Sequence, residues 1–198
     1  QAGQFQEATA IYRRVLEAQP DHADANNLLG MLHHQSGDNE GAVALISKAI
    51  GSNPGVVDYH SNLGFILRRL GRLQEARISL EKAIQIDPQF AEAHNNLGVV
   101  YLDLGEFEDA IASHQKALDL NPDFPQALNN LDTALHQVGR LNDAVDHYAK
   151  AIVLNPDFVD GLSNLGNTLQ ELGRLDDAVA SYQKALALNP DYHEALYN

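Results

Sequence analysis

Histidine and carboxylate side chains are the residues of this sequence that could bind a metal ion or transfer a proton. There are nine histidines among the 198 residues. His33 and His34 are neighbours that would point to different sides of a helix, and His60 and His94 lie 34 residues apart. Neither pair has the spacing of a metal site, and no HExxH motif occurs. We therefore expect no metal centre and no cofactor.

Catalytic motifs are missing as well. The sequence has no P-loop, no dinucleotide-binding glycine pattern, no nucleophile elbow and no cysteine. Acidic pairs such as Asp176–Asp177 lie where a helix is expected to begin, and negative charge at that end stabilises a helix. We predict that the chain is not an enzyme. The lack of cysteine favours a reducing, cytoplasmic compartment.

The overall charge restricts the class of partner. With 13 Lys and Arg against 27 Asp and Glu, the formal net charge is −14, which repels nucleic-acid phosphates and anionic lipid. No apolar run approaches the roughly 20 residues of a membrane-spanning helix. A protein or peptide, basic or neutral, is therefore the expected partner, with no nucleic acid and no membrane insertion.

Asparagine pairs are the remaining residues with hydrogen-bonding chemistry. The segment LNPDFPQALNNLDTALHQVGRL has Asn129 and Asn130 in the middle of a helical apolar pattern. Each asparagine costs a helix roughly 0.6–0.7 kcal/mol relative to alanine, so their presence needs a reason. Asn95 and Asn96 form the same pair 34 residues earlier, which indicates a repeated pattern.

A period of 34 residues runs through the whole chain. Prolines follow it at Pro20, Pro54, Pro88, Pro122, Pro156 and Pro190. Glycines follow it at Gly3, Gly37, Gly71, Gly105, Gly139 and Gly173. Apolar residues recur at helical spacing on both sides of each glycine, which predicts a helix, a glycine turn and a second helix that ends before proline. The chain is therefore a repeat protein.

The unit resembles the tetratricopeptide repeat. With each series proline at position 32, position 7 is leucine in every full unit, at Leu29, Leu63, Leu97, Leu131 and Leu165. The resemblance implies an all-α fold, a right-handed superhelical solenoid of antiparallel helix pairs. We predict a single solenoid over residues 1–198, with a partial repeat that has only a second helix (1–22), five full repeats (23–56, 57–90, 91–124, 125–158 and 159–192) and the start of a truncated repeat (193–198).

First helices line the concave surface in this family, so positions 5 and 6 are candidates for a ligand-binding row. Position 6 supplies Asn62, Asn96, Asn130 and Asn164, and position 5 supplies Asn27, Asn95 and Asn129. Two interpretations stay open. Either each amide bonds a neighbouring helix and sets the stagger of the repeats, or the row binds the backbone of an extended peptide, since an amide both donates and accepts.

One aromatic and basic patch is expected beside this row. Phe65, Arg68 and Arg69 share a first helix and could anchor a ligand. The alternative is a solvated arginine pair beside an exposed ring. Family members that bind chaperone C-termini carry lysine or arginine at positions 2, 5 and 6 of successive first helices. This sequence has none there, so a carboxylate clamp is disfavoured.

Two departures from the repeat pattern predict local behaviour. Asp132 replaces the small residue expected where the two helices of a unit cross, so we expect either partial exposure or a partner, which could be His136 one turn later or a backbone donor. In the first full repeat, His33, Asn39 and Ser52 occupy positions that are apolar in most later units. We predict that this repeat opens most readily.

Three functions are compatible with these features. The first is a module that binds a peptide or extended protein segment in the groove of the first helices. The second follows from a likeness to the arm of O-GlcNAc transferase and SPINDLY-like glycosyltransferases, in which an asparagine ladder helps to bind the protein substrate and catalysis lies in a separate domain. The segments that carry this likeness are NLLGMLHHQSGDNEGAVALISKAI, YHSNLGFILRRLGRLQEA and NPDFPQALNNL. The third is a scaffold that self-associates end to end, because the partial repeat would expose Phe5, Ile11 and Tyr12.

Overall fold

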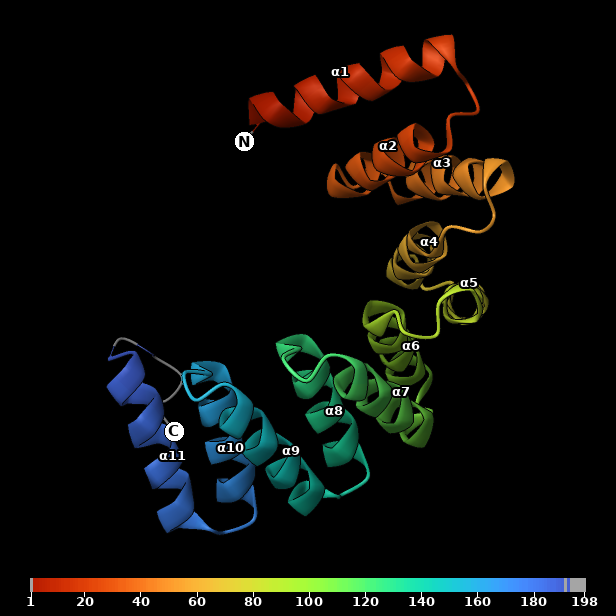
Figure 1. Cartoon of the computed structure of the whole chain (residues 1–198). Helices are drawn as coiled ribbons and strands as arrows, with labels where there is room; N and C mark the ends of the chain where they lie inside the picture. Colours follow the sequence, from red (N-terminus) through yellow and green to blue (C-terminus); the bar gives the residue numbers. More distant parts are fainter. Residues whose placement is uncertain (1, 191, 193–198) are drawn as a thin grey trace. The chain divides into compact units, whose positions relative to one another are not determined.

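The computed structural model describes residues 2–190 and residue 192, with side chains from Phe5 onward. The described residues form eleven α-helices (Figure 1). Their bounds are α1 Ala2–Ala18, α2 Ala23–Gln35, α3 Asn39–Ser52, α4 Val57–Arg69, α5 Leu73–Ile86, α6 Ala91–Leu104, α7 Phe107–Leu120, α8 Pro125–Gln137, α9 Leu141–Leu154, α10 Val159–Glu171 and α11 Leu175–Leu188. None of these described helices is both long and apolar enough to cross a bilayer. The truncated repeat expected at 193–198 lies outside the described residues.

The helices pack as sequential antiparallel pairs, which confirms the predicted all-α repeat fold. Within a unit, first helices pair with the second helices that follow them, as in α2–α3, α4–α5 and α10–α11 (Figure 1). The first helices α2, α4, α6, α8 and α10 each begin at position 1 of a repeat. The second helices α3, α5, α7, α9 and α11 each end two residues before its proline.

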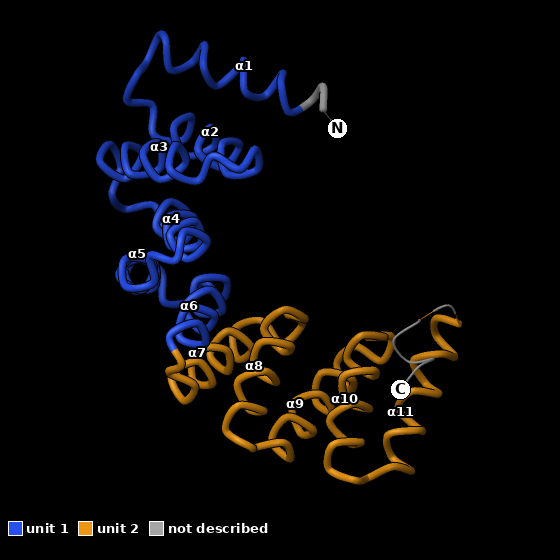
Figure 2. Tube along the Cα trace, turned by 180° about the vertical axis from the view of Figure 1, so that it is seen from behind, with its two compact units in different colours: residues 1–104 blue, residues 105–198 orange. Residues whose placement is uncertain are grey.

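The chain divides into two compact units, residues 1–104 and residues 105–198 (Figure 2). The first unit contains α1 to α6, and the second contains α7 to α11. The boundary falls at Gly105, inside the third full repeat, so α6 and α7 belong to different units. The prediction of one continuous solenoid over residues 1–198 stays a prediction.

Glycine is required at the turn inside each pair because the backbone there is left-handed. Gly71 has a φ of +74°, a region that costs other residues about 1–2 kcal/mol. Its N–H donates to the carbonyl of Arg68, and the N–H of Arg72 donates to the carbonyl of Leu67, both over 2.9 Å. These two bonds satisfy the last carbonyls of α4 in a Schellman motif, so the sequence period of the glycines marks where first helices end.

The two helices of a pair approach closely at position 8 of the repeat. A Cβ added to Gly64 would lie 2.5 Å from Cγ of Leu80, and one added to Gly166 would lie 2.4 Å from Cε1 of Tyr182. The backbone of a first helix therefore packs directly on side chains of its second helix. Ala76, which borders the contact at Gly64, is fully buried. A larger residue at either position would force the helices apart.

Each unit has its own apolar core. In the first unit, Ile46 and Leu80 on second helices are completely buried. In the second unit, Leu131 and Tyr148 are buried against each other's helices. Because these residues pack between one pair and the next, neighbouring repeats within a unit are stabilised by a shared interface.

Position 4 ties a first helix to the loop before it in the early repeats. Nε2 of His60 donates to the carbonyl of Pro54 over 2.9 Å, and Nε2 of His94 donates to the carbonyl of Pro88 over 3.0 Å. These bonds give the two equivalent histidines a structural role at the position where the family often has an aromatic residue. The last two repeats have leucine at this position, which has no polar atom to donate.

Candidate functional site

The asparagines predicted to form a row at positions 5 and 6 of the repeats, called the ladder residues below, bond first helices to one another. In the first unit, Nδ2 of Asn62 on α4 donates to Oδ1 of Asn27 on α2 over 3.1 Å. Nδ2 of Asn96 on α6 donates to Oγ of Ser61 on α4 over 3.5 Å. In both cases the partners are 35 residues apart, so position 6 of one repeat bonds position 5 of the repeat before it. These are the contacts expected if the amides set the stagger of the repeats.

The second unit has the same contact with an additional donor. Nδ2 of Asn164 on α10 donates to Oδ1 of Asn129 on α8 over 2.7 Å. The hydroxyl of Tyr148 on α9 donates to the same oxygen over 3.2 Å. Burial raises the pKa of Tyr148, so its hydroxyl keeps the proton that it donates. Asn129 therefore joins three helices of this unit.

The ladder residues differ in how much surface they keep for a ligand. Position-6 residues are half-buried, at Asn62, Asn96, Asn130 and Asn164. Among position-5 residues, Asn129 is exposed, whereas Asn27 and Asn95 are each only 6% exposed. A side-chain amide has its donor and its acceptor on opposite sides of Cγ. An amide whose Nδ2 is bound to the preceding repeat therefore has Oδ1 on the side away from that contact.

The predicted anchor patch on α4 is only partly solvated. Phe65 is half-buried and meets the ring of His34 edge to face, with ring centroids 5.3 Å apart and an interplanar angle of 85°. Nε of Arg68 donates to Oδ2 of Asp103 on α6 over 2.6 Å. Arg69 is exposed. Arg68 thus forms an ion pair with a residue of the neighbouring first helix. Of the two arginines, Arg69 is the one that faces solvent.

Asp132 on α8 has the partner that the sequence predicted. Its Oδ1 lies 3.3 Å from Nε2 of His136, one turn later on the same helix. The hydroxyl of Thr168 on α10 also donates to this oxygen, over 3.4 Å. Burial raises the pKa of Asp132, and the opposing effects of His136 and Thr168 do not cancel it. The expected contact is confirmed, and it compensates only in part for the loss of water around the carboxylate.

His136 also connects two repeats. Its Nδ1 lies 3.2 Å from Oε2 of Glu171 on α10, so the ring stands between two carboxylates. This contact joins position 12 of one repeat to position 13 of the next, as Arg68 and Asp103 do in the first unit. Sequence reasoning missed both pairs. Their separation of 35 residues, the same as between ladder partners, could have revealed them.

The polar residues of the first full repeat bond one another. Nδ1 of His33 lies 2.7 Å from Oδ2 of Asp38, and Nδ1 of His34 lies 2.6 Å from Oδ1 of Asn39. Asp38 also accepts the N–H of Gly41 at the start of α3, and this bond, followed by the one with His33, lowers the pKa of Asp38.

In the part of the chain that the structure describes, no group of three or more His, Cys, Asp or Glu could hold a metal ion.

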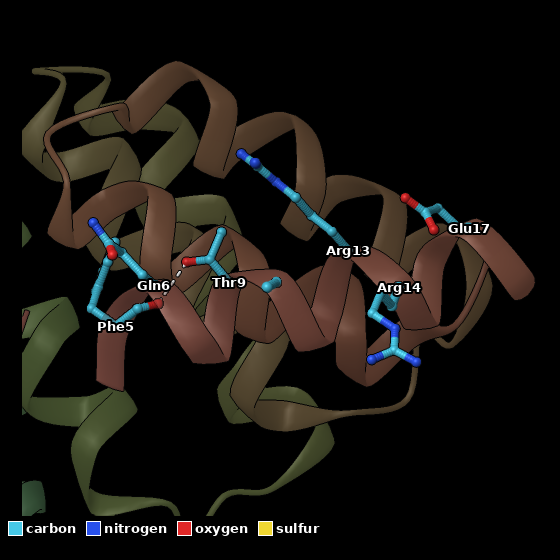
Figure 3. A pocket seen from close by; sticks show the side chains of 7 residues that line it. Phe5, Gln6, Thr9, Arg13, Arg14 and Glu17 are labelled. Carbon is cyan, nitrogen blue, oxygen red and sulfur yellow. Dashed lines mark hydrogen bonds between the residues drawn. The ribbon is translucent and has the colours of Figure 1, made fainter. Parts of the chain in front are cut away.

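An open hollow lies along α1 (Figure 3). The labelled side chains that line it are Phe5, Gln6, Thr9, Arg13, Arg14 and Glu17. Of the three α1 residues predicted to be exposed, Ile11 is 51% exposed, while Phe5 and Tyr12 are half-buried. The apolar surface offered by α1 is therefore smaller than the sequence predicted.

Models of one protein family match nearly the whole sequence. Models described as Tetratricopeptide repeat match residues 1–57, 91–124 and 159–192, and a model described as TPR repeat matches residues 66–105 and 133–173. The chain belongs to the tetratricopeptide repeat family. The glycine turns and the close crossings at position 8 are features of its tetratricopeptide repeats.

Solved structures of similar proteins have the same fold. MamA is 27% identical, with a TM-score of 0.71 over 84% of this chain and 97% of that chain. PilW, a widely conserved type IV pilus biogenesis factor, is 24% identical, with a TM-score of 0.82 over 99% of this chain and 91% of that chain. YrrB, a TPR protein with an unusual peptide-binding site, is 22% identical, with a TM-score of 0.68 over 94% of this chain and 96% of that chain.

Membership of the tetratricopeptide repeat family places the chain among protein-interaction modules. The matched family models describe repeats and no catalytic domain. A comparison with curated protein sequences gives no match. The narrower likeness to the arm of O-GlcNAc transferase and SPINDLY-like glycosyltransferases gains no support from these comparisons.

Proposed function

We propose that this chain binds an extended peptide segment along the first helices of its units, without catalysing a reaction. The observation that carries the proposal is the row of position-6 asparagines. Their Nδ2 atoms bond the preceding repeat at Asn62, Asn96 and Asn164, which leaves Oδ1 on the opposite side of the amide. Acceptors held at one position of successive repeats suit a ligand with donors at a regular interval, and the N–H groups of an extended peptide have this property.

The spacing of first helices is compatible with such a ligand. In the first unit α2 contacts α4 and α4 contacts α6. Packed helices lie about 8–10 Å apart, and an extended peptide advances about 3.3 Å per residue. A bound peptide would therefore meet one ladder amide about every third residue. Contacts of this kind involve the peptide backbone, so we expect binding to tolerate many sequences.

The net contribution of these amides to the free energy of folding is small, which is compatible with a second role in ligand binding. A hydrogen bond contributes about 1 kcal/mol net to folding, and asparagine costs a helix roughly 0.6–0.7 kcal/mol relative to alanine. These contributions nearly cancel, so the inter-repeat bonds by themselves add little stability. Ligand binding by the remaining acceptor gives the row a further reason to be asparagine.

Charge favours a basic peptide over an acidic one. Position 2 of a first helix, one turn before the ladder position, carries an exposed carboxylate at Asp24, Asp58, Glu92 and Asp160. The net charge of −14 adds long-range attraction for cations. Of the two arginines among the candidate anchors, Arg68 already forms an ion pair with Asp103. An acidic ligand could therefore pair only with Arg69 without competing with a carboxylate of the chain.

The test is a variant in which all four position-6 asparagines, Asn62, Asn96, Asn130 and Asn164, are replaced by alanine. Binding of fluorescently labelled lysine-containing peptides is followed by anisotropy, and helicity by circular dichroism. We expect at least a tenfold loss of affinity with unchanged helicity. Asn142→Ala, at an exposed asparagine on the second helix α9, is the matched control. Unchanged binding contradicts the proposal, and lost helicity would show that the amides serve only the fold.

End-to-end self-association is the second candidate, and exposed apolar residues favour it. Ile11 on α1 is 51% exposed, and Val179 on α11 is 52% exposed. Val145, at the equivalent position one repeat before Val179, is half-buried against the core around α10 and α11. Sedimentation velocity over a range of concentrations is expected to show association that Val179→Lys abolishes. A monomer at every concentration would rule it out.

A cytoplasmic location, expected from the lack of cysteine, stays a prediction.

A further inference from the structure

One face of each first helix combines positions 2, 6, 9 and 13 of the repeat. These positions lie within about 60° of one another around the helix axis, because each residue advances by about 100°. On α4 they are Asp58, Asn62, Phe65 and Arg69. Asp58 and Arg69 are exposed, while Asn62 and Phe65 are half-buried. The ladder asparagine therefore has a carboxylate one turn before it and a large apolar side chain one turn after it.

The equivalent positions of neighbouring first helices form rows across the first unit. Cα atoms of α4 lie within 8 Å of Cα atoms of α2 and of α6. Ladder bonds from α4 to α2 and from α6 to α4 hold positions 5 and 6 of neighbouring repeats together. Position 9, one turn later, therefore also recurs from helix to helix. Its residues, called the apolar row below, are the half-buried Met31, Phe65 and Val99.

The first unit keeps more apolar surface on these helices than the second unit does. At the ladder position of α2 the chain has Leu28, which is 42% exposed. In the second unit, position 9 is polar, with Thr133 on α8 and Asn167 on α10. A ligand of the first unit can therefore bury apolar side chains beside the ladder, whereas the second unit offers it polar groups there.

Carboxylates border the ladder on its other side. Asp58 and Glu92 are exposed at position 2, one turn before Asn62 and Asn96. Asp24, at the same position of α2, accepts a hydrogen bond from the hydroxyl of Tyr59. A ligand lying along the amides would thus have anionic groups on one side and apolar groups on the other.

The interval between neighbouring first helices selects the conformation of such a ligand. Packed helices lie about 8–10 Å apart, so equivalent groups on α2, α4 and α6 recur at about that interval. A β-strand presents the same face every two residues, or about 6.6 Å, and its residues three apart point to opposite sides. A polyproline II helix has three residues per turn and presents the same face after about 9.3 Å. Of these two conformations, polyproline II matches the rows.

A polyproline II segment also leaves its backbone available to the ladder. It has no internal hydrogen bonds, so the N–H of every residue other than proline can donate to an outside acceptor. Nδ2 of Asn62 and Nδ2 of Asn96 donate to the preceding first helix, so Oδ1 is the atom through which each amide would accept. One N–H per turn of the ligand then meets one amide per repeat.

We infer that the first unit binds a peptide in the polyproline II conformation with an apolar side chain at every third residue, which contacts the apolar row. A basic side chain of each turn reaches the carboxylates of Asp58 and Glu92 on the other side of the ladder. The third residue of each turn faces solvent and can be proline. This inference rests on the proposed function and adds to it the conformation and the three-residue period of the ligand.

Three fluorescently labelled peptides of identical composition and charge test the period. Two have a three-residue repeat, (Val-Pro-Lys)₄ and (Val-Lys-Pro)₄, because the order of the residues depends on the direction in which the peptide lies. The third has the same twelve residues with valine at every second position, as a β-strand would require. Binding is measured by anisotropy. We expect at least one periodic peptide to bind about tenfold more tightly than the alternating one, and equal or reversed affinities would overturn the inference.

Substitution in the apolar row provides the second measurement. Val99→Thr keeps the shape of the side chain and introduces the residue that the fourth full repeat has at this position, Thr133. It should weaken binding of the periodic peptide about three- to fivefold, as loss of one buried methyl group does, and leave the alternating peptide unaffected. Val153→Thr, at a residue of α9 that is 80% exposed, is the matched control.

Unchanged affinity of the periodic peptide for Val99→Thr would contradict the contact with the apolar row. Helicity is followed by circular dichroism, and if Val99→Thr does not fold, Met31→Gln replaces it, since both residues are good helix formers of similar length. If the periodic and alternating peptides bind equally and the fourfold asparagine variant loses both, the proposed function stands and the three-residue period is wrong. If none of the peptides binds, both are wrong.

Discussion

Asn62 on α4 donates its side-chain amide to Asn27 on α2, 35 residues earlier in the chain. The same separation relates Arg68 to Asp103, a charged pair rather than an amide pair. Residues 34 apart are equivalent in neighbouring repeats, and one further residue turns a side chain by about 100° around its helix. These two inter-repeat contacts therefore join a position of one repeat to the next position of its neighbour, and this offset predicts where further partners lie.

The close crossing at Gly64 predicts opposite effects for two glycine substitutions. Gly64→Ala places a Cβ 2.5 Å from Leu80, so we expect it to lower the free energy of unfolding by about 1–3 kcal/mol. Gly51→Ala on α3 meets no atom within 4 Å and is expected to raise it by about 0.5–1 kcal/mol, because alanine favours the helix. Urea denaturation measures both. Equal effects of the two substitutions would contradict the close contact.

His114 predicts a loss of stability in mild acid. It is completely buried, and burial lowers its pKa from 6.5 to about 4. The unfolded chain binds this proton below about pH 6.5 and the folded chain does not, so the free energy of unfolding falls as the pH drops from about 6.5 to about 4. The full effect is on the order of 3 kcal/mol. Above pH 6.5 this residue contributes no pH dependence.

Replacement of His114 isolates that effect. His114→Leu introduces the residue that Leu80 supplies at the equivalent position, and it should be markedly less sensitive to pH between about 6.5 and 4.5 in urea denaturation. An unchanged slope would show that other groups cause the acid sensitivity.

Arg68 and Asp103 predict a modest, salt-dependent contribution to the first unit. Their side chains are 28% and 36% exposed, so Arg68→Gln should lower the free energy of unfolding by about 0.5–1 kcal/mol in low salt. In about 1 M salt, where the Debye length is about 3 Å, the effect should shrink. Arg69→Gln, at the exposed neighbour, is the control. An equal loss from both substitutions would mean that the pair has no special role.

The first full repeat is expected to exchange its amide hydrogens faster than the other full repeats. Ser52 is exposed at the end of α3 and its hydroxyl bonds the carbonyl of Lys48, whereas later units have isoleucine or leucine at this position. Ser52→Ile should slow opening of α2 and α3 by about two- to fivefold, through apolar contacts and removal of the competing backbone bond. The measurement is amide hydrogen exchange followed by mass spectrometry. Faster exchange in α10 and α11 than in α2 and α3 would contradict this ranking.

Contacts within one helix or one helix pair could be predicted from the sequence, because they depend only on periodicity. The series glycines marked the left-handed turns such as Gly71, and the small residue at Gly64 marked the crossing with Leu80. Asp132 and His136 are one turn apart, so their contact followed from helical geometry alone. Each of these relationships depends on a residue spacing within one helix or one helix pair.

By itself, the sequence determined the repeat, the helix pairs and which residues occupy equivalent positions. Only the tertiary structure decided which positions of neighbouring repeats contact one another. The bond from Asn164 to Asn129, the contact of His136 with Glu171 and the half-burial of Phe65 depend on how far one first helix is shifted along the next. That shift results from the packing of side chains across the interface, since a 34-residue period is compatible with many staggers and only close packing selects one.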